Sequence, residues 1–313
     1  MKRIILHAGL HRTGTTSVQI AASESRDELV KRGVLFPEGC NLYPDQHSSV
    51  AFDLKNGREE KVVERLTEIE RKADELGCEK IFLSGEEFCD VNAELLSKFN
   101  TLCFAPVTVF LTFRNYAEWF SSQVRYQSNF VPGFLFFDAM NQVVKLNYSE
   151  IINNFSSAFG DDAVQALDFK ALKHNLVTNA FKAMLDVDGL ATNDYPTINA
   201  SLSFGASSIT SMLATDFSPL ERLKVIKRLG ERTQHLDTSA LKTLDHNLKA
   251  SIVPPAGCFD HPKLAGFKEE LMRTPSIALS NGQHSEEGVE YIRVLLSVID
   301  ELQNERVLEA AND

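Results

Sequence analysis

A short stretch near the start of the chain combines glycines, hydroxyls and basic residues at a spacing that suits an anion. Residues 7–19 read HAGLHRTGTTSVQ. Successive backbone N–H groups of a glycine-rich turn, followed by the N-terminus of a helix, form a cradle for a phosphate-like group. The stretch therefore predicts an anion-binding loop. We expect the anion to be bound by Gly9, His11, Arg12, Thr13, Gly14, Thr15 and Thr16.

The loop differs from the ATP-binding kind at the position after its second glycine. Thr15 stands where such a loop places a lysine, and the cation of this loop, Arg12, lies inside it. In ATP-binding loops, the hydroxyl that follows the lysine also holds Mg²⁺ on the nucleotide phosphates. The Gly-Lys-Ser/Thr ending of such loops is missing here, and no strand is followed by a clear magnesium-binding aspartate. The sequence therefore favours metal-free transfer of a less highly charged group.

A second candidate anion site follows an apolar run about 100 residues further on. Residues 107–113 read VTVFLTF, and Arg114 comes directly after them, with Ser122 eight positions later. An arginine at a strand end can bind a phosphate through two N–H groups, and a serine two helical turns later can donate to the same phosphate. A simple ion pair between Arg114 and Glu118 is the alternative, but the first loop makes phosphate binding the preferred interpretation.

Both stretches need strands that end at one edge of a sheet. Apolar runs alternate with amphipathic segments, which is typical of a parallel α/β sheet that binds ligands at the carboxyl ends of its strands. The predicted strands are 2–9, 80–88 with its exit loop, 106–113 and 163–169, and the predicted helices are 15–33, 58–77 and 117–127.

The C-terminal part of the chain has a different pattern. Beyond about residue 180 the signal is mostly helical, and residues 285–311 form its clearest segment. Since no stretch reads as a linker, we expect one domain over residues 1–313. Within it, residues 1–180 would form an α/β nucleotide-binding core and residues 181–313 a mostly helical part.

Composition excludes several classes of partner. The chain has 43 acidic and 32 basic residues, a net charge of −11, and no run of basic residues, so a nucleic-acid backbone would be repelled. The longest apolar windows are about half the ~20 residues that a membrane span needs, and the N-terminus carries no cleavable apolar segment. The five cysteines fall at no metal-ligand spacing, so we expect reduced thiols in a cytoplasmic protein.

The two anion motifs together resemble the sulfotransferases that use 3′-phosphoadenosine 5′-phosphosulfate (PAPS), especially the bacterial carbohydrate-type members. That family's loop commonly reads His-x-Gly-x-x-Lys-Thr-Gly-Thr-Thr and then, after a short gap, Gln. Here Arg12 replaces the lysine, and Gln19 is the glutamine. Arg114 and Ser122 match the family's 3′-phosphate segment, with Glu118 where aspartate is more common. The resemblance is specific over the first 130 residues and implies a P-loop-type three-layer fold with a central parallel sheet.

Weaker parallels extend this resemblance to about residue 210. The family's strand ending in Ser-x-Glu-x-Phe aligns with Ser84, Glu86 and Phe88, and a histidine near the start of a helix aligns with His47. A further Asn-x-Ser-Leu segment begins at Asn199. The family's late basic, glycine-rich loop is not found in this sequence.

The resemblance implies sulfuryl transfer from PAPS, without a metal, to a hydroxyl of a carbohydrate or glycoconjugate. Arg12 would relieve charge on the departing phosphate, and a base must take the acceptor's proton. Glu86 is the first choice for this base, and Glu87 and His47 are its rivals. Two alternatives stay open: a small-molecule kinase with an atypical phosphate loop, and a nucleotide-binding relative that has lost turnover through Arg12. The acceptor itself is not identified by any motif.

Overall fold

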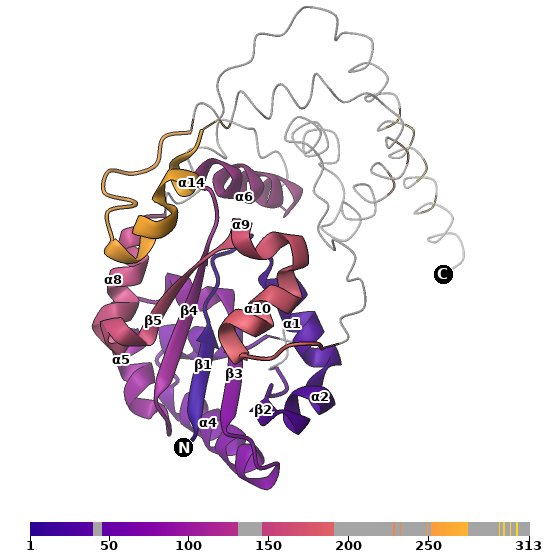
Figure 1. Cartoon of the computed structure of the whole chain (residues 1–313), viewed down its shortest axis with the longest axis vertical. Helices are drawn as coiled ribbons and strands as arrows, with labels where there is room; N and C mark the ends of the chain where they lie inside the picture. Colours follow the sequence, from indigo (N-terminus) through magenta and orange to yellow (C-terminus); the bar gives the residue numbers. More distant parts are fainter. Residues whose placement is uncertain are drawn as a thin grey trace, which may run out of the picture. The chain divides into compact units, whose positions relative to one another are not determined.

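The computed structural model describes residues 1–39, 46–130, 146–190 and 252–274 (Figure 1). It also describes seven single residues: Arg228, Arg232, Lys249, Val294, Ser297, Glu301 and Glu305. The chain divides into two compact units. The α/β unit comprises residues 1–115, 146–198 and 254–272, and the second unit comprises residues 116–145, 199–253 and 273–313. That the two units belong to one domain, as the sequence predicts, stays a prediction.

A five-stranded parallel sheet forms the centre of the α/β unit. Its strands are β1 (Arg3–His7), β2 (Val34–Leu35), β3 (Lys80–Ser84), β4 (Val107–Phe113) and β5 (Val164–Asp168), in the order β2-β3-β1-β4-β5. Four of these strands coincide with the four predicted apolar runs, whereas the two-residue strand β2 was not predicted. The central strand β1 is buried from Ile4 to His7, as expected of a parallel strand covered on both faces.

Helices cover both faces of this sheet (Figure 1). On one face, α1 (Thr15–Glu24), α2 (Arg26–Lys31) and α10 (Leu176–Leu185) pack on a core that includes Ile5, Phe82 and Phe181. The opposite layer consists of α3 (Ser48–Lys55), α4 (Glu59–Glu75), α5 (Ala93–Leu102) and α8 (Tyr148–Phe159). The predicted α/β class is therefore confirmed, and the arrangement is consistent with a P-loop-type three-layer fold.

The predicted helices match the observed ones, with one break. The predicted helix 15–33 divides at Ser25 into α1 and α2. The predicted helix 58–77 is α4, and the glycine after it, Gly77, has a φ of +65°, which suits a helix stop. In the second unit, α6 (Tyr116–Phe130) contains the predicted helix 117–127. The predicted helix 285–311 lies outside the described residues apart from four single positions.

Short elements complete the carboxyl edge of the sheet. A 3₁₀ turn, η1 (Glu86–Asp90), follows β3, and α9 (Phe169–Leu172) follows β5. The turns η2 (Asp161–Ala163), η3 (Lys173–Asn175) and η4 (Pro262–Phe267) and the helix α14 (Lys268–Met272) are the remaining elements of this unit. Within the part of the chain that the structure describes, no helix has both the length and the apolar character needed to cross a membrane.

Candidate functional site

The loop between β1 and α1 has an unusual backbone. Two of its residues have positive φ: Arg12 at 68° and Gly14 at 81°. A left-handed conformation is uncommon for a residue with a side chain and costs about 1–2 kcal/mol, and such conformations concentrate at functional sites. Thr13 folds the loop onto itself, because its hydroxyl donates to the Leu10 carbonyl oxygen at 2.6 Å and its N–H donates to the same oxygen at 3.2 Å.

The missing side chain of Gly9 leaves a small space that is lined by polar atoms. A Cβ atom on Gly9 would lie 2.8 Å from His7 Nε2, 2.8 Å from Thr15 Oγ1 and 3.1 Å from Thr13 Oγ1. Among the residues that the structure places, Thr15 Oγ1 is buried and has no hydrogen-bond partner. Buried polar atoms normally have partners, so an unpaired hydroxyl at a loop–helix junction fits a site that donates to a ligand oxygen. The hydroxyl proton of Thr13 is directed to Leu10 instead.

The second predicted motif meets this loop at the carboxyl end of β4. Arg114 Nη1 donates to the Arg12 carbonyl oxygen at 3.1 Å, and the Arg114 guanidinium lies 5.2 Å from the centre of the Phe169 ring. The Tyr148 hydroxyl donates to the Arg114 carbonyl oxygen at 2.9 Å. Contacts from the loop, α9 and α8 thus hold Arg114 beside the candidate anion site.

The other two residues of that motif lie in the second unit. Ser122 and Glu118 are both on α6, where Ser122 is buried and Glu118 is half-buried. The predicted contact of Ser122 with a 3′-phosphate stays a prediction.

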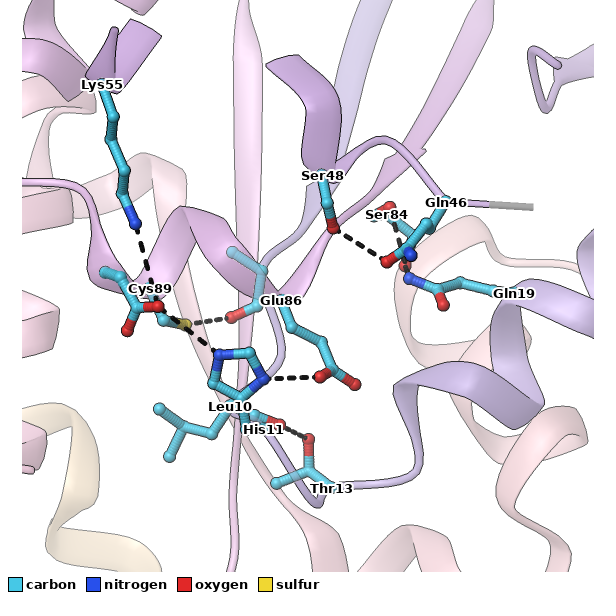
Figure 2. A network of polar contacts seen from close by, with 12 residues as sticks. Leu10, His11, Thr13, Gln19, Gln46, Ser48, Lys55, Ser84, Glu86 and Cys89 are labelled. Carbon is cyan, nitrogen blue, oxygen red and sulfur yellow. Dashed lines mark hydrogen bonds and ion pairs between the residues drawn. The ribbon is translucent and has the colours of Figure 1, made fainter. Parts of the chain in front are cut away.

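A buried polar cluster surrounds Ser84 at the end of β3. His7 Nδ1 and Gln19 Nε2 lie 3.0 Å and 3.1 Å from Ser84 Oγ, and Figure 2 shows the Gln19 and Ser84 side chains facing each other. The pairing of β1 with β3 places His7 directly opposite Ser84. This cluster fixes the start of the loop between β1 and α1 to the end of the neighbouring strand.

His47 uses both of its ring nitrogens within the protein. The Ser84 N–H donates to His47 Nδ1 at 3.0 Å, and His47 Nε2 donates to the Pro37 carbonyl oxygen at 3.2 Å. Burial lowers the pKa of His47 to about 4, so the ring is neutral at physiological pH. Because its lone pair already accepts a hydrogen bond from the backbone, this geometry argues against His47 as the base for an acceptor hydroxyl.

Glu86 lies at the start of η1 and contacts His11. His11 Nδ1 is 2.7 Å from Glu86 Oε2, and His11 Nε2 is 3.5 Å from Asp90 Oδ2 (Figure 2). Burial lowers the pKa of His11, but hydrogen bonds and charges from Asp90 and Glu86 outweigh it and raise this pKa to about 10. The sequence motif assigned His11 to phosphate binding, whereas the structure directs both of its nitrogens toward carboxylates. The third candidate base, Glu87, is half-buried on the same turn.

Two glycines allow close approaches that define this edge of the sheet. A Cβ on Gly14 would lie 2.3 Å from Leu176 Cδ2 of α10, and a Cβ on Gly85 would lie 3.1 Å from the Ser48 backbone nitrogen of α3. The Cys89 thiol also anchors the loop by donating to the Ala8 carbonyl oxygen at 2.8 Å.

Sequence reasoning missed three contributors to the site, and two of them left a signal. Asp90 is an acidic residue in the exit segment after β3, and Phe169 comes directly after the predicted fourth strand, so both lie at the carboxyl edge of the sheet. Leu176 carried no signal, since its contact with the loop depends on how α10 packs.

The described ranges contain no group of three or more His, Cys, Asp or Glu side chains placed to hold a metal ion. Four of the five cysteines, Cys78, Cys89, Cys103 and Cys258, are free thiols, and Cys40 lies outside the described residues.

Comparison with known proteins gives a similar solved structure but no family. No protein-family model matches the sequence, and no curated protein matches it significantly. Among solved structures, a sulfotransferase from Alicyclobacillus acidocaldarius is similar, with a TM-score of 0.40 and 12% sequence identity over 77% of this chain and 99% of that chain. A likeness of this size says nothing about activity, so the function must be inferred from the motifs and from the geometry of the site.

Proposed function

We propose that this protein is a sulfotransferase that transfers a sulfuryl group from PAPS to a hydroxyl of a carbohydrate or glycoconjugate. The observation that carries the proposal is the 3.1 Å hydrogen bond from Arg114 to the Arg12 carbonyl oxygen. It joins the two motifs that are predicted to bind anions and that lie 102 positions apart in the chain. A nucleotide with separate phosphates at its 3′ and 5′ positions requires two such sites at one sheet edge, whereas a nucleoside triphosphate requires one loop.

The residues of the loop suit the 5′-phosphosulfate. The backbone N–H groups that lead into α1, with the hydroxyls of Thr15 and Thr16, would donate to its oxygens. The space at Gly9 lets an oxygen approach the backbone and the unpaired Thr15 hydroxyl. Arg114 would bind the 3′-phosphate, with Ser122 as its predicted second donor.

The proposed reaction requires charge stabilisation on one side and a base on the other. The acceptor oxygen attacks the sulfur, and the bond from sulfur to the 5′-phosphate oxygen breaks with its electron pair on the phosphate. Arg12 and the loop N–H groups would stabilise that developing charge. Glu86 would accept the acceptor's proton, because its carboxylate is half-buried at the sheet edge while both nitrogens of His47 are engaged. The products are a sulfate ester and adenosine 3′,5′-bisphosphate.

Calorimetry with three nucleotides tests this proposal. We expect adenosine 3′,5′-bisphosphate to bind in the micromolar range without added metal, which corresponds to about −8 kcal/mol. Because charge-assisted contacts to the 3′-phosphate are absent from 5′-AMP, that ligand should bind roughly 10–100-fold more weakly. Arg114→Ala should remove most of this difference, whereas Arg71→Ala, an exposed arginine on α4, should preserve it.

Two results would count against the proposal. Equal affinities for the bisphosphate and for 5′-AMP would remove the 3′-phosphate site. Tighter binding of ATP with Mg²⁺ than of the bisphosphate would favour the kinase alternative.

A further inference from the structure

A row of charged side chains runs from the anion loop across η1 to α3. His11 Nδ1 contacts Glu86 Oε2 at 2.7 Å, and His11 Nε2 lies 3.5 Å from Asp90 Oδ2. The same Asp90 oxygen lies 3.8 Å from Lys55 Nζ. Figure 2 shows the His11 ring facing the Glu86 carboxylate, with Lys55 on the side of the ring away from Glu86.

The charge on His11 follows from this arrangement. A neutral imidazole has one N–H, so only the imidazolium can donate to both carboxylates. The charged groups that contact it are Glu86 and Asp90 from η1, and Lys55 from α3 reaches the same Asp90 carboxylate. Burial lowers the pKa of His11, but the effect of the two carboxylates is larger and raises this pKa to about 10. The ring is therefore charged at neutral pH.

We propose that His11 is the positioning residue of the base: it orients Glu86 through Nδ1 and is itself fixed by Asp90 through Nε2. This inference rests on the proposed function, in which Glu86 accepts the proton of the acceptor hydroxyl. It also assigns His11 to the acceptor side of the site, and not to the donor's phosphates.

The physical reason lies in the freedom of a glutamate side chain. A half-exposed Glu samples several rotamers, and holding a catalytic group in one orientation is worth large factors in rate. The 2.7 Å contact with a charged imidazole fixes one oxygen of Glu86, which leaves the other oxygen, Oε1, to receive the proton. His11 keeps its own protons throughout, so it holds the base in place and takes no part in the proton transfer.

A double-mutant cycle separates positioning from donor binding. The variants are His11→Gln, Glu86→Gln and the double variant, and the readouts are calorimetry of adenosine 3′,5′-bisphosphate and its release from PAPS in a mixture of monosaccharides. Release of the bisphosphate reports transfer of the sulfuryl group to any hydroxyl, including that of water. His174→Gln, an exposed histidine on η3, is the matched control.

We expect His11→Gln to lower kcat roughly 10–100-fold, since a misplaced catalytic group costs factors of this size. Glu86→Gln should lower kcat roughly 10²–10⁴-fold. Binding of the bisphosphate should stay unchanged in both variants. The double variant should be no slower than Glu86→Gln alone, because His11 acts through Glu86.

Titration of the His11 ring, followed by NMR of labelled histidines, gives a second readout that does not depend on turnover. In the wild type the His11 signals should not shift between pH 6 and 8. In Asp90→Asn, which removes one of the two carboxylates, the titration should move to lower pH, and kcat should decline on the alkaline side of that new midpoint. A wild-type His11 that titrates near its ordinary value of about 6.5 would overturn the proposal.

Failure of the proposed function and failure of the His11 role are distinguishable. A wild type that releases no bisphosphate refutes the proposed function and the role of His11 with it. A wild type that turns over while His11→Gln keeps its kcat refutes the positioning role alone. If His11→Gln weakens bisphosphate binding as much as it lowers kcat, His11 belongs to the donor site and the inference is wrong.

Discussion

Gly14 lies where the loop between β1 and α1 contacts α10, and adding one methyl group tests that contact. Its φ is +81°, and a Cβ there would lie 2.3 Å from Leu176 Cδ2. A left-handed residue with a side chain costs about 1–2 kcal/mol. Turning the Leu176 side chain away costs about another 0.5–1.5 kcal/mol. Alanine also restricts the unfolded chain, which offsets about 0.4–1 kcal/mol. Gly14→Ala should therefore lower the free energy of unfolding by about 0.5–3 kcal/mol.

Gly77→Ala is the matched control, and urea denaturation is the assay. Gly77 has a φ of +65°, and a Cβ on it would meet no atom within 4 Å in the described part of the chain. Gly77→Ala therefore has the same cost of a left-handed residue and the same restriction of the unfolded chain, but it makes no contact like that with Leu176. The difference between the two variants isolates the approach of Leu176, about 0.5–1.5 kcal/mol. Gly14→Ala should also weaken bisphosphate binding, whereas Gly77→Ala should not. If the two variants lose equal stability, α10 does not pack on the loop in this way and the reasoning is refuted.

Two further predictions concern the loop arginine and the buried histidines. Arg12→Ala should lower kcat with PAPS far more than it weakens bisphosphate binding, and Arg12→Lys should retain turnover. An unchanged kcat in the alanine variant would show that Arg12 does not stabilise the departing phosphate. Burial lowers the pKa of His7 and His47 to about 4, below the unfolded value of 6.5, so the unfolded chain binds more protons between these values. Urea denaturation should therefore show that the free energy of unfolding falls as the pH drops from about 7 to 4, by up to about 3 kcal/mol per histidine. A free energy of unfolding that does not change with pH, in both the wild type and His47→Gln, would contradict this.

Strand positions were predictable because their signal is local. The run at residues 107–113 is continuous in apolar and β-branched residues, and β4 covers the predicted strand 106–113 except for its first residue, Pro106. Since parallel strands end at one edge, the sequence also indicated that the loop after β1, Glu86 and Arg114 would share that edge. The contact between Arg114 and the loop confirms that the first and last of these meet.

The direction of individual side chains could not be predicted, because it depends on backbone conformations that no local sequence pattern indicates. The positive φ of Arg12 is unusual for a residue with a side chain, and no local pattern indicates it. The loop around it directs His11 to Glu86 and the Thr13 hydroxyl to Leu10, so two residues assigned to phosphate contact the protein instead. Likewise, the apolar residues of 15–33 suited one helix and gave no sign of the break at Ser25.

The strained Arg12 backbone and the position of Arg114 have one explanation in common. A left-handed arginine costs about 1–2 kcal/mol, and such a conformation persists only where its surroundings hold it. Here the carbonyl of that same residue accepts a hydrogen bond from Arg114, whose guanidinium is in turn fixed over Phe169. The group proposed to bind the 3′-phosphate therefore also supports the loop proposed to bind the 5′-phosphosulfate. Arg114→Ala should consequently weaken 5′-AMP binding as well, though less than bisphosphate binding, because the two motifs form one physically connected site.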